Sequence, residues 1–246
     1  MTTRVFVAGA TGVIGRSLIP LLRAAGHSIT GATRTTEGES KLEAQGVNPV
    51  VLDVFDCDAL ERAVVAAAPD VVIHQLTDLA AGIDSQSPEQ GLKRNARLRR
   101  EGTANLANAA RAAGAKRLIA QSIAWAYAPK DAPFLETDPL DIHARGARAI
   151  SVCEGVVPLE SAVLDQSEFV GIVLRYGQLY GPRTWSAEPT GSAPVHVEAA
   201  AYAAFLAIDH GGSGAYNIAD PGGAVAIEKA VADLGWRHDF RIKERG

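Results

Sequence analysis

A glycine-rich run near the amino terminus has the residue types and spacing that most directly imply chemistry. Residues 9–15 read Gly-Ala-Thr-Gly-Val-Ile-Gly and follow the apolar run of residues 4–8. This order predicts a strand, a tight turn and a helix whose first amides face a pyrophosphate. The three glycines would permit the turn, the approach of the backbone to the phosphates, and close packing of helix on strand. The residues predicted to contact the dinucleotide are Gly9, Thr11, Gly12, Val13, Ile14 and Gly15.

The elements that must position this turn alternate along the first two-thirds of the chain. Strand-like apolar runs are separated by helical patterns, which is typical of βαβ units that build a parallel sheet in an α/β protein. We expect strands near residues 5–8, 28–33, 49–53, 71–75, 118–121, 171–176 and 215–219. Helices are expected over 13–25, 88–113, 198–209 and 225–234.

Composition limits the partners of the protein. The 246 residues carry 24 Lys and Arg against 28 Asp and Glu, a formal net charge of −4, which gives no general attraction to nucleic acid or an anionic membrane. Cys57 and Cys153 lack metal-type spacing and are expected as thiols of a reducing compartment. No apolar run approaches the ~20 residues of a membrane span, and a strand is predicted almost at the start of the chain. We therefore expect a cytoplasmic protein with no metal, nucleic-acid or membrane partner.

Several motifs together resemble the extended branch of the short-chain dehydrogenase/reductase superfamily, which includes NAD-dependent epimerases and dehydratases. They are the glycine run, Val-Val-Ile-His at 71–74, Glu-Gly-Thr-Ala-Asn-Leu at 101–106 and Leu-Arg-Tyr-Gly-Gln-Leu-Tyr-Gly-Pro at 174–182. The resemblance implies one Rossmann-type, doubly wound parallel-sheet domain over 1–246, in which 180–246 contribute a small, abbreviated substrate-binding region. It also implies an NAD(P)-dependent enzyme with a small-molecule substrate. Pairing as a homodimer through the helices over 88–113 and 145–164 is an expectation by analogy.

The resemblance places further residues along the cofactor. It implies that Asp53 and Val54 lie at the edge of the adenine. Leu76 and Thr77 would line the cleft at the carboxyl end of the fourth strand, and Tyr176 and Gln178 would border the nicotinamide. For Asp53 the alternative is a charge or cap at the start of the next helix.

The choice of nicotinamide cofactor depends on the end of the second predicted strand. An NAD site normally has Asp or Glu there to bind the ribose hydroxyls, and such a carboxylate would repel a 2′-phosphate. Residues 30–36 read Thr-Gly-Ala-Thr-Arg-Thr-Thr, without an acid, and Arg34 can make a charge-assisted contact with a phosphate. The alternative for Arg34 is a solvated loop arginine. The sequence favours NADP over NAD.

The resembled enzymes usually move a proton with a Tyr-x-x-x-Lys pair, aided by a Ser or Thr just after the fifth strand. Residues 141–165 contain neither tyrosine nor lysine. Counting back from Tyr127, the hydroxyl position falls on Ile123, and Ser122 precedes it. The active-site asparagine of the long helix falls on Arg99, while Asn95 lies one turn earlier. The usual acid/base residues are therefore missing.

Tyr127 and Ser122 are predicted as a replacement catalytic site, because the loop after a parallel strand opens into the cleft; the alternative for Tyr127 is a packing tyrosine. Arg99 is predicted in the cofactor cleft, where it could bind a carboxylate or phosphate, or on a solvated helix face. The leading hypothesis is an atypical NADP-binding oxidoreductase that uses hydride transfer. The alternatives are a non-catalytic dinucleotide sensor or scaffold and a nucleotide-sugar epimerase or dehydratase.

Other residues carry structural expectations. Pro158 predicts a kinked or restarted helix. Trp125 and Trp185 suit either a small pocket or a dimer face. His74 is expected to be a packed residue at the end of a strand rather than a ligand, because no Cys, His or Asp stands near it with metal spacing.

Overall fold

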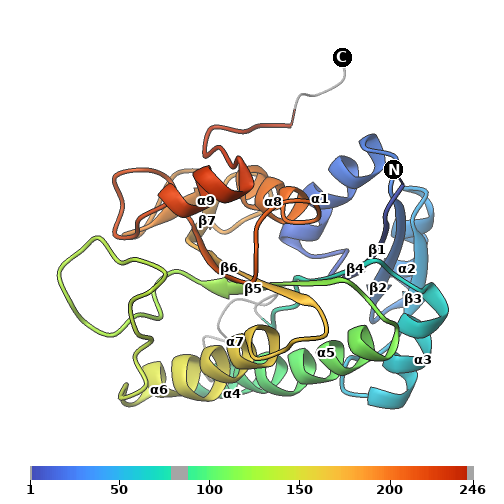
Figure 1. The fold of residues 1–246 in the computed structure, drawn as a ribbon, viewed down its shortest axis with the longest axis horizontal. Coiled ribbons are helices and arrows are strands. Elements are labelled where there is room, and N and C mark those ends of the chain that lie inside the picture. The colour runs from blue at the N-terminus through green and yellow to red at the C-terminus, as the bar shows by residue number, and fades with distance from the viewer. Residues whose placement is uncertain (1, 79–87, 243–246) are drawn as a thin grey trace.

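Seven parallel strands form the central sheet in the order β3-β2-β1-β4-β5-β6-β9. A computed structural model describes residues 2–78 and 88–242 (Figure 1). The strands are β1 (Arg4–Ala8), β2 (Ser28–Thr33), β3 (Asn48–Val51), β4 (Val71–His74), β5 (Arg117–Ile123), β6 (Val170–Tyr176) and β9 (Gly214–Ile218). A separate parallel pair joins β7 (Gln178–Tyr180) to β8 (Pro194–His196). This is the doubly wound order that the sequence predicts, and the fold class is confirmed.

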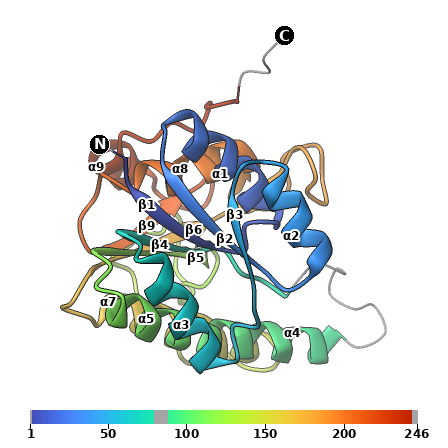
Figure 2. The same ribbon diagram turned by 90° about the vertical axis from the view of Figure 1, so that its right-hand side faces the viewer.

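Helices cover both faces of the sheet, as Figure 1 shows edge-on. One layer contains α1 (Val13–Ala24), α8 (Val197–Leu206) and α9 (Glu228–Leu234), and the opposite layer contains α3 (Cys57–Ala67), α5 (Thr103–Ala112) and α7 (Val157–Leu164). The helix α2 (Thr36–Glu43) packs on β2 and β3 at the edge of the sheet (Figure 2). None of the helices in the described ranges is long and apolar enough to cross a membrane.

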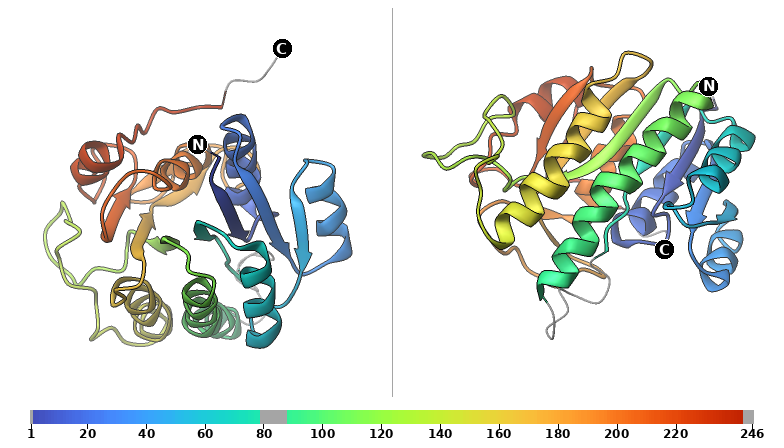
Figure 3. Two further views of the ribbon diagram at one scale, coloured as in Figure 1. Left: turned by 45° about the vertical axis from the view of Figure 1, so that its right-hand side comes forward. Right: turned by 90° about the horizontal axis from the view of Figure 1, so that it is seen from below.

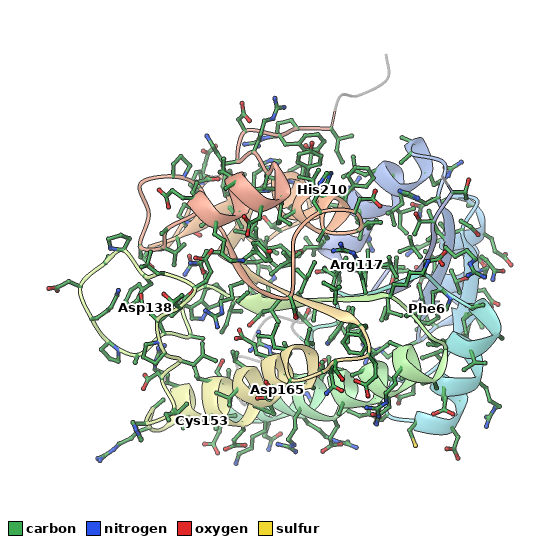
Figure 4. The ribbon with its side chains drawn as sticks, viewed as in Figure 1. Phe6, Arg117, Asp138, Cys153, Asp165 and His210 are labelled. Carbon is green, nitrogen blue, oxygen red and sulfur yellow. The ribbon has the colours of Figure 1, made fainter. Side chains whose placement is uncertain are left out.

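Alternation along the strands supplies the two cores. In β1, Val5 and Val7 pack into the apolar cluster under α1 and α8, whereas Phe6 and Ala8 pack into the cluster on the other face. Both sides of a parallel sheet are covered, so its strands read as continuous apolar runs. At the amino end of β5, Arg117 donates to the carbonyl oxygens of His210 at 2.9 Å and Gly211 at 3.0 Å. These hydrogen bonds join the strand to the turn after α8 (Figure 4).

Two long helices lie side by side beneath the sheet (Figure 3, right). The first runs from α4 (Pro88–Arg97) through a π-helical turn, η1 (Leu98–Gly102), into α5, and the second from α6 (Ala147–Ser151) through a π-helical turn, η2 (Val152–Val156), into α7. Pro158 lies in the first turn of α7, so the predicted break appears as a change of helix type. Such π-turns are often found at functional sites.

Most predicted elements are present with ends shifted by one to three residues. The third strand ends at Val51 rather than residue 53, and the last helix begins at Glu228 rather than residue 225. The helix α2 lies between β2 and β3, where the alternation predicts a helix, whereas the short strands β7 and β8 were not predicted. The chain reverses its strand order between β1 and β4, so the glycine turn lies at the switch point where such sheets bind ligands.

His74 is fully buried at the end of β4, as the sequence predicts for a packed residue. Its Nδ1 accepts the Leu76 N–H at 3.1 Å, so Nε2 carries the proton and donates to the Thr103 hydroxyl at 2.9 Å. Burial, with a smaller contribution from the Arg99 charge, lowers the pKa of His74 to about 3. The ring is therefore neutral in the folded protein.

We predict that His74 makes folding stability fall on acidification. In the unfolded chain, His74 has a pKa of about 6.5 and takes up a proton below that pH, whereas in the folded protein it does not. This difference lowers the free energy of unfolding by about 1.4 kcal/mol per pH unit. Between about pH 7 and about pH 5 the wild type should lose about 2 kcal/mol more stability than His74→Gln, measured by urea denaturation. Equal losses in the two proteins would contradict the prediction.

Candidate functional site

A cleft of about 910 Å³ crosses the carboxyl ends of the strands on either side of the switch point. The glycine turn forms its floor. Gly9 has a φ of +90°, and a Cβ there would lie 2.7 Å from the Gln75 carbonyl oxygen, while a Cβ at Gly15 would overlap the Gly9 carbonyl oxygen. These positions therefore exclude side chains, and the roles of turn and close packing predicted for the glycines are met. The exposed amides at the start of α1 suit an anionic ligand.

The predicted cofactor residues come together in this cleft. Gly15 lies beneath the turn as a packing residue and does not line the cleft. The predicted residues that do line it are Gly9, Thr11, Gly12, Val13, Ile14, Arg34, Asp53, Val54, Leu76, Thr77, Arg99, Tyr176 and Gln178. Their contacts with a dinucleotide stay a prediction.

Asp53 lies on the cleft wall just beyond β3. Its carboxylate accepts the Phe55 N–H at 3.0 Å, whereas α3 is capped by Asp56, which accepts the Ala59 N–H at 3.0 Å. The alternative role of Asp53 as the helix cap is therefore excluded. Asp53 instead stabilises the turn before α3 and lines the cleft.

Arg34 is exposed beyond the end of β2 and lines the cleft. The next residue, Thr35, caps α2 by accepting the Gly38 N–H at 3.0 Å. Across the glycine turn, the Arg16 Nε donates to the Thr11 carbonyl oxygen at 2.8 Å. Two guanidinium groups thus flank the edge of the cleft at which NAD-specific proteins carry an acid.

The cleft is electropositive although the chain as a whole is acidic. Six arginines and two aspartates line it, and both aspartates have partners: Asp78 accepts the Arg94 Nε at 3.1 Å, and Asp53 binds a backbone amide. Cationic walls around a concave site concentrate anionic ligands. The lining therefore fits a ligand with several phosphates.

The structure corrects the prediction that Tyr127 is a replacement proton donor. Its side chain is 3% exposed, stacks on Phe134 and does not line the cleft. The hydroxyl donates to the Asn217 Oδ1 at 2.6 Å and accepts from the Arg175 Nη1 at 2.9 Å. Burial raises the pKa of this phenol. Tyr127 is the packing tyrosine that the sequence left as the alternative.

Ser122 lines the inner wall of the cleft, but its hydroxyl is already engaged. It donates to the Glu160 Oε1 at 2.7 Å, and the same carboxylate accepts from the Arg175 Nε at 3.0 Å and Nη2 at 2.6 Å. All three side chains are buried. In this arrangement the Ser122 proton belongs to a structural network and is not directed at a ligand.

The remaining acid/base positions are hydrocarbon. The helix after β5 carries Val152 and Val156 at the four-residue spacing of a Tyr-x-x-x-Lys pair, and both are buried against Ile123 in one apolar cluster. Ile123 also lines the cleft. Asn95 offers no substitute, because its Oδ1 accepts the Asp78 N–H at 2.9 Å. In the part of the chain that the structure describes, the helix after β5 supplies no residue to the lining of the cleft, so no Tyr or Lys from it can move a proton there.

The sequence analysis missed some cleft residues. Gln75 donates to the Tyr176 hydroxyl at 3.2 Å, and Gln121 donates to the Leu76 carbonyl oxygen at 2.9 Å. Their positions at the carboxyl ends of β4 and β5 are the signal that could have identified them. Trp125 and Trp185, 40% and 74% exposed, also line the cleft, which favours the pocket over the dimer face for these rings.

A parallel sheet in this order, with a glycine turn at its switch point and an electropositive cleft above, defines a dinucleotide-binding protein of the Rossmann class. A family model described as the NAD dependent epimerase/dehydratase family matches residues 5–217. The chain belongs to that family, as the resemblance to extended short-chain dehydrogenases/reductases implied. Within the described residues no group of three or more His, Cys, Asp or Glu could hold a metal ion.

Among curated proteins, the chain is 42% identical over 245 residues to a 3-diazoavenalumate denitrifying reductase from Streptomyces, covering 92% of this chain and 78% of the relative. Together with the family, this relative supports an oxidoreductase or epimerase type of activity.

Among solved structures, the chain is similar to a UDP-glucose 4-epimerase from Thermotoga maritima with UDP-glucose, with a TM-score of 0.76 and 18% identity over 96% of this chain and 94% of the other. It is also similar to a UDP-glucose 4-epimerase from Thermus thermophilus in complex with NAD, with a TM-score of 0.74 and 21% identity over 97% and 95% of the two chains. These likenesses support the fold.

The network at Ser122 generates a stability prediction. Glu160→Gln removes the charge that compensates buried Arg175, and breaking a buried ion pair costs about 3–5 kcal/mol. The control Asp233→Asn breaks the exposed pair with Lys229, 3.5 Å apart, and should cost less than about 1 kcal/mol. Chemical denaturation measures both. Equal effects of the two substitutions would show that the buried pair does not stabilise the fold.

Proposed function

We propose that this protein is an NADPH-dependent reductase whose acceptor takes a hydride without needing a proton from the enzyme. The observation that carries the proposal is that residues 141–165 contain no Tyr or Lys, while Val152 and Val156 of this segment form an apolar cluster with Ile123. Reduction of a ketone produces an alkoxide that must be protonated, and a positioned acid contributes roughly 10²- to 10⁴-fold in rate. A protein that lacks this group is suited to another acceptor.

A diazo-bearing compound is such an acceptor, and the 42%-identical relative is named as a denitrifying reductase of one. NADPH, when bound, supplies the hydride. In the net reaction of a diazonium group, a C–H bond forms and the C–N bond breaks, with its electron pair leaving in dinitrogen. The cation and the hydride together give two neutral products. No proton enters or leaves, so the missing acid/base pair costs nothing.

The residues of this chain would bind and orient the two partners. The glycine turn would hold the pyrophosphate, and Tyr176 and Gln178 would border the nicotinamide. Burial raises the pKa of Tyr176, so its phenol stays protonated while it accepts from Gln75. Ile123, Leu179 and the two tryptophans give the substrate end apolar walls that suit an aromatic electrophile.

The preference for NADPH rests on the edge of the cleft beyond β2. Residues 34–36 directly after the strand contain no carboxylate, Glu37 is paired with Lys41 and does not line the cleft, and Arg34 and Arg16 both line it. A guanidinium can bind the 2′-phosphate with two parallel hydrogen bonds. A cytoplasmic location and a homodimer remain predictions.

The reaction is tested with NADPH deuterated at C4 and a benzenediazonium carboxylate in ordinary water. We expect one deuterium in the arene product and one dinitrogen released per NADPH oxidised, and no label from D₂O when the cofactor is unlabelled. Gly9→Ala, whose Cβ would press on the Gln75 carbonyl oxygen, serves as the variant without a cofactor site. Label from solvent would contradict the proposal, and NADPH binding without turnover would favour the sensor alternative.

The cofactor preference is tested by fluorescence titration with NADPH and NADH. Arg34→Ala should weaken NADPH binding by about 10- to 100-fold, because hydrogen bonds to a charged group contribute about 1.5–3 kcal/mol. NADH binding should stay unchanged. Arg62→Ala, an exposed arginine of α3 outside the cleft, is the control. Equal weakening of both cofactors, or tighter binding of NADH by the wild type, would refute the assignment to NADP.

A further inference from the structure

Arg99 is a buried cation on the inner wall of the cleft. It lies in the π-turn η1, its residue is 3% exposed, and it lines the cleft. Its Nε is buried and has no hydrogen-bond partner within the described part of the chain. Burial lowers the pKa of Arg99 to about 10, which leaves the guanidinium charged at neutral pH. Buried charges are normally paired, so this arginine requires an explanation.

Among the residues that the structure describes, the charges around Arg99 do not fully compensate it. Glu160 is the nearby carboxylate that favours the charged form of Arg99. Glu160 already accepts hydrogen bonds from the Arg175 Nε and Nη2 and from the Ser122 hydroxyl. His74, which also faces Arg99, is neutral. Two guanidinium groups therefore share one carboxylate, and the inner wall carries an excess positive charge.

The fold makes space for this side chain. Gly155, in the π-turn η2 of the neighbouring helix, faces Arg99, and a Cβ at Gly155 would lie 3.3 Å from the Arg99 Cδ and 3.2 Å from the Ala96 Cα. The two π-turns thus meet at a residue without a side chain, against which the arginine stem lies. The guanidinium is held in place without using its Nε in the protein.

We propose that Arg99 binds the carboxylate of the substrate and thereby selects anionic aromatic compounds. This inference rests on the proposed function, because it assumes that the substrate lies in the same cleft as the cofactor. A carboxylate accepts two parallel hydrogen bonds from a guanidinium and supplies the negative charge that the inner wall lacks. Trp125 and Trp185 on the cleft wall offer ring faces to a flat aromatic body.

The glycine turn is the part of the cleft expected to bind the pyrophosphate, whereas we assign Arg99 to the substrate. Arg99 instead shares the inner wall with Ser122 and Ile123, at the carboxyl end of β5. Loss of Arg99 is therefore expected to change substrate binding and to leave cofactor binding nearly unchanged.

The test is calorimetric titration of the full chain, saturated with NADP⁺, with 2-naphthoate and with its neutral counterpart 2-naphthamide. The wild type should bind the carboxylate at least about 10-fold more tightly than the amide. Arg99→Met should weaken carboxylate binding by about 10- to 100-fold and amide binding by less than about threefold. Arg99→Lys should retain part of the preference. Arg100→Met, at the exposed neighbouring position, should behave as the wild type.

Thermal unfolding of the same variants separates recognition from folding. An arginine needed only for structure would lower the melting temperature when replaced, whereas Arg99→Met removes an incompletely compensated buried charge and should unfold at or above the wild-type temperature. Equal binding of naphthoate and naphthamide by the wild type would overturn the proposal. So would an unchanged carboxylate preference in Arg99→Met, or a loss of NADP⁺ affinity as large as the loss of carboxylate affinity.

These titrations need no turnover, so they fail independently of the proposed reaction. A carboxylate preference that depends on Arg99, without release of dinitrogen from a diazonium substrate, would support the anion site and reject the reductase activity. Deuterium transfer from NADPH, together with a carboxylate preference that Arg99→Met leaves unchanged, would support the reductase activity and reject the anion site.

Discussion

The buried ion pair between Glu160 and Arg175 determines how the inner half of the cleft can be used. It joins α7 to β6, and its carboxylate also holds Ser122 of β5. The same Arg175 donates to the Tyr127 hydroxyl, and that ring packs in the apolar cluster on the α1 and α8 face of the sheet rather than lining the cleft. One network thus commits a serine, a tyrosine and a carboxylate to structure. Because that carboxylate is already shared, the neighbouring Arg99 remains without a full counter-charge.

The cleft therefore divides into two chemically different halves. The half formed by the glycine turn and the end of β2 keeps the features that a dinucleotide requires, namely open amides, absent side chains and cationic walls. The half formed by the ends of β5 and β6 and by the π-turn η1 of the first long helix has no Tyr-x-x-x-Lys pair and offers Ile123, two tryptophans and the Arg99 guanidinium. The proposed reaction matches this division, because a hydride acceptor that needs no proton would use the first half for the cofactor and the second for binding.

The sequence was sufficient where local patterns decide the structure. The glycine spacing, the apolar strands and the end of β2 each depend on neighbouring residues, and the fold and the cleft residues followed from them. Tyr127 was assigned wrongly because its direction depends on Arg175 and Asn217, 48 and 90 residues away in the chain. The burial of Arg99 was equally inaccessible, since it requires a π-turn in one helix and Gly155 in another. Hydrophobic periodicity does not reveal a single extra residue in a helical turn.

The contact between Gly155 and Arg99 has an evolutionary consequence. With the Ala96 Cα at 3.2 Å and the Arg99 Cδ at 3.3 Å from a potential Cβ, a side chain at position 155 would press on both and require the arginine stem or the helix backbone to shift. Substitutions at positions 155 and 99 are therefore coupled. Among related sequences, a glycine in the second helix matched by an arginine in the first would mark the lineage that shares this pocket, and a larger residue at the glycine position would mark those that diverged from it.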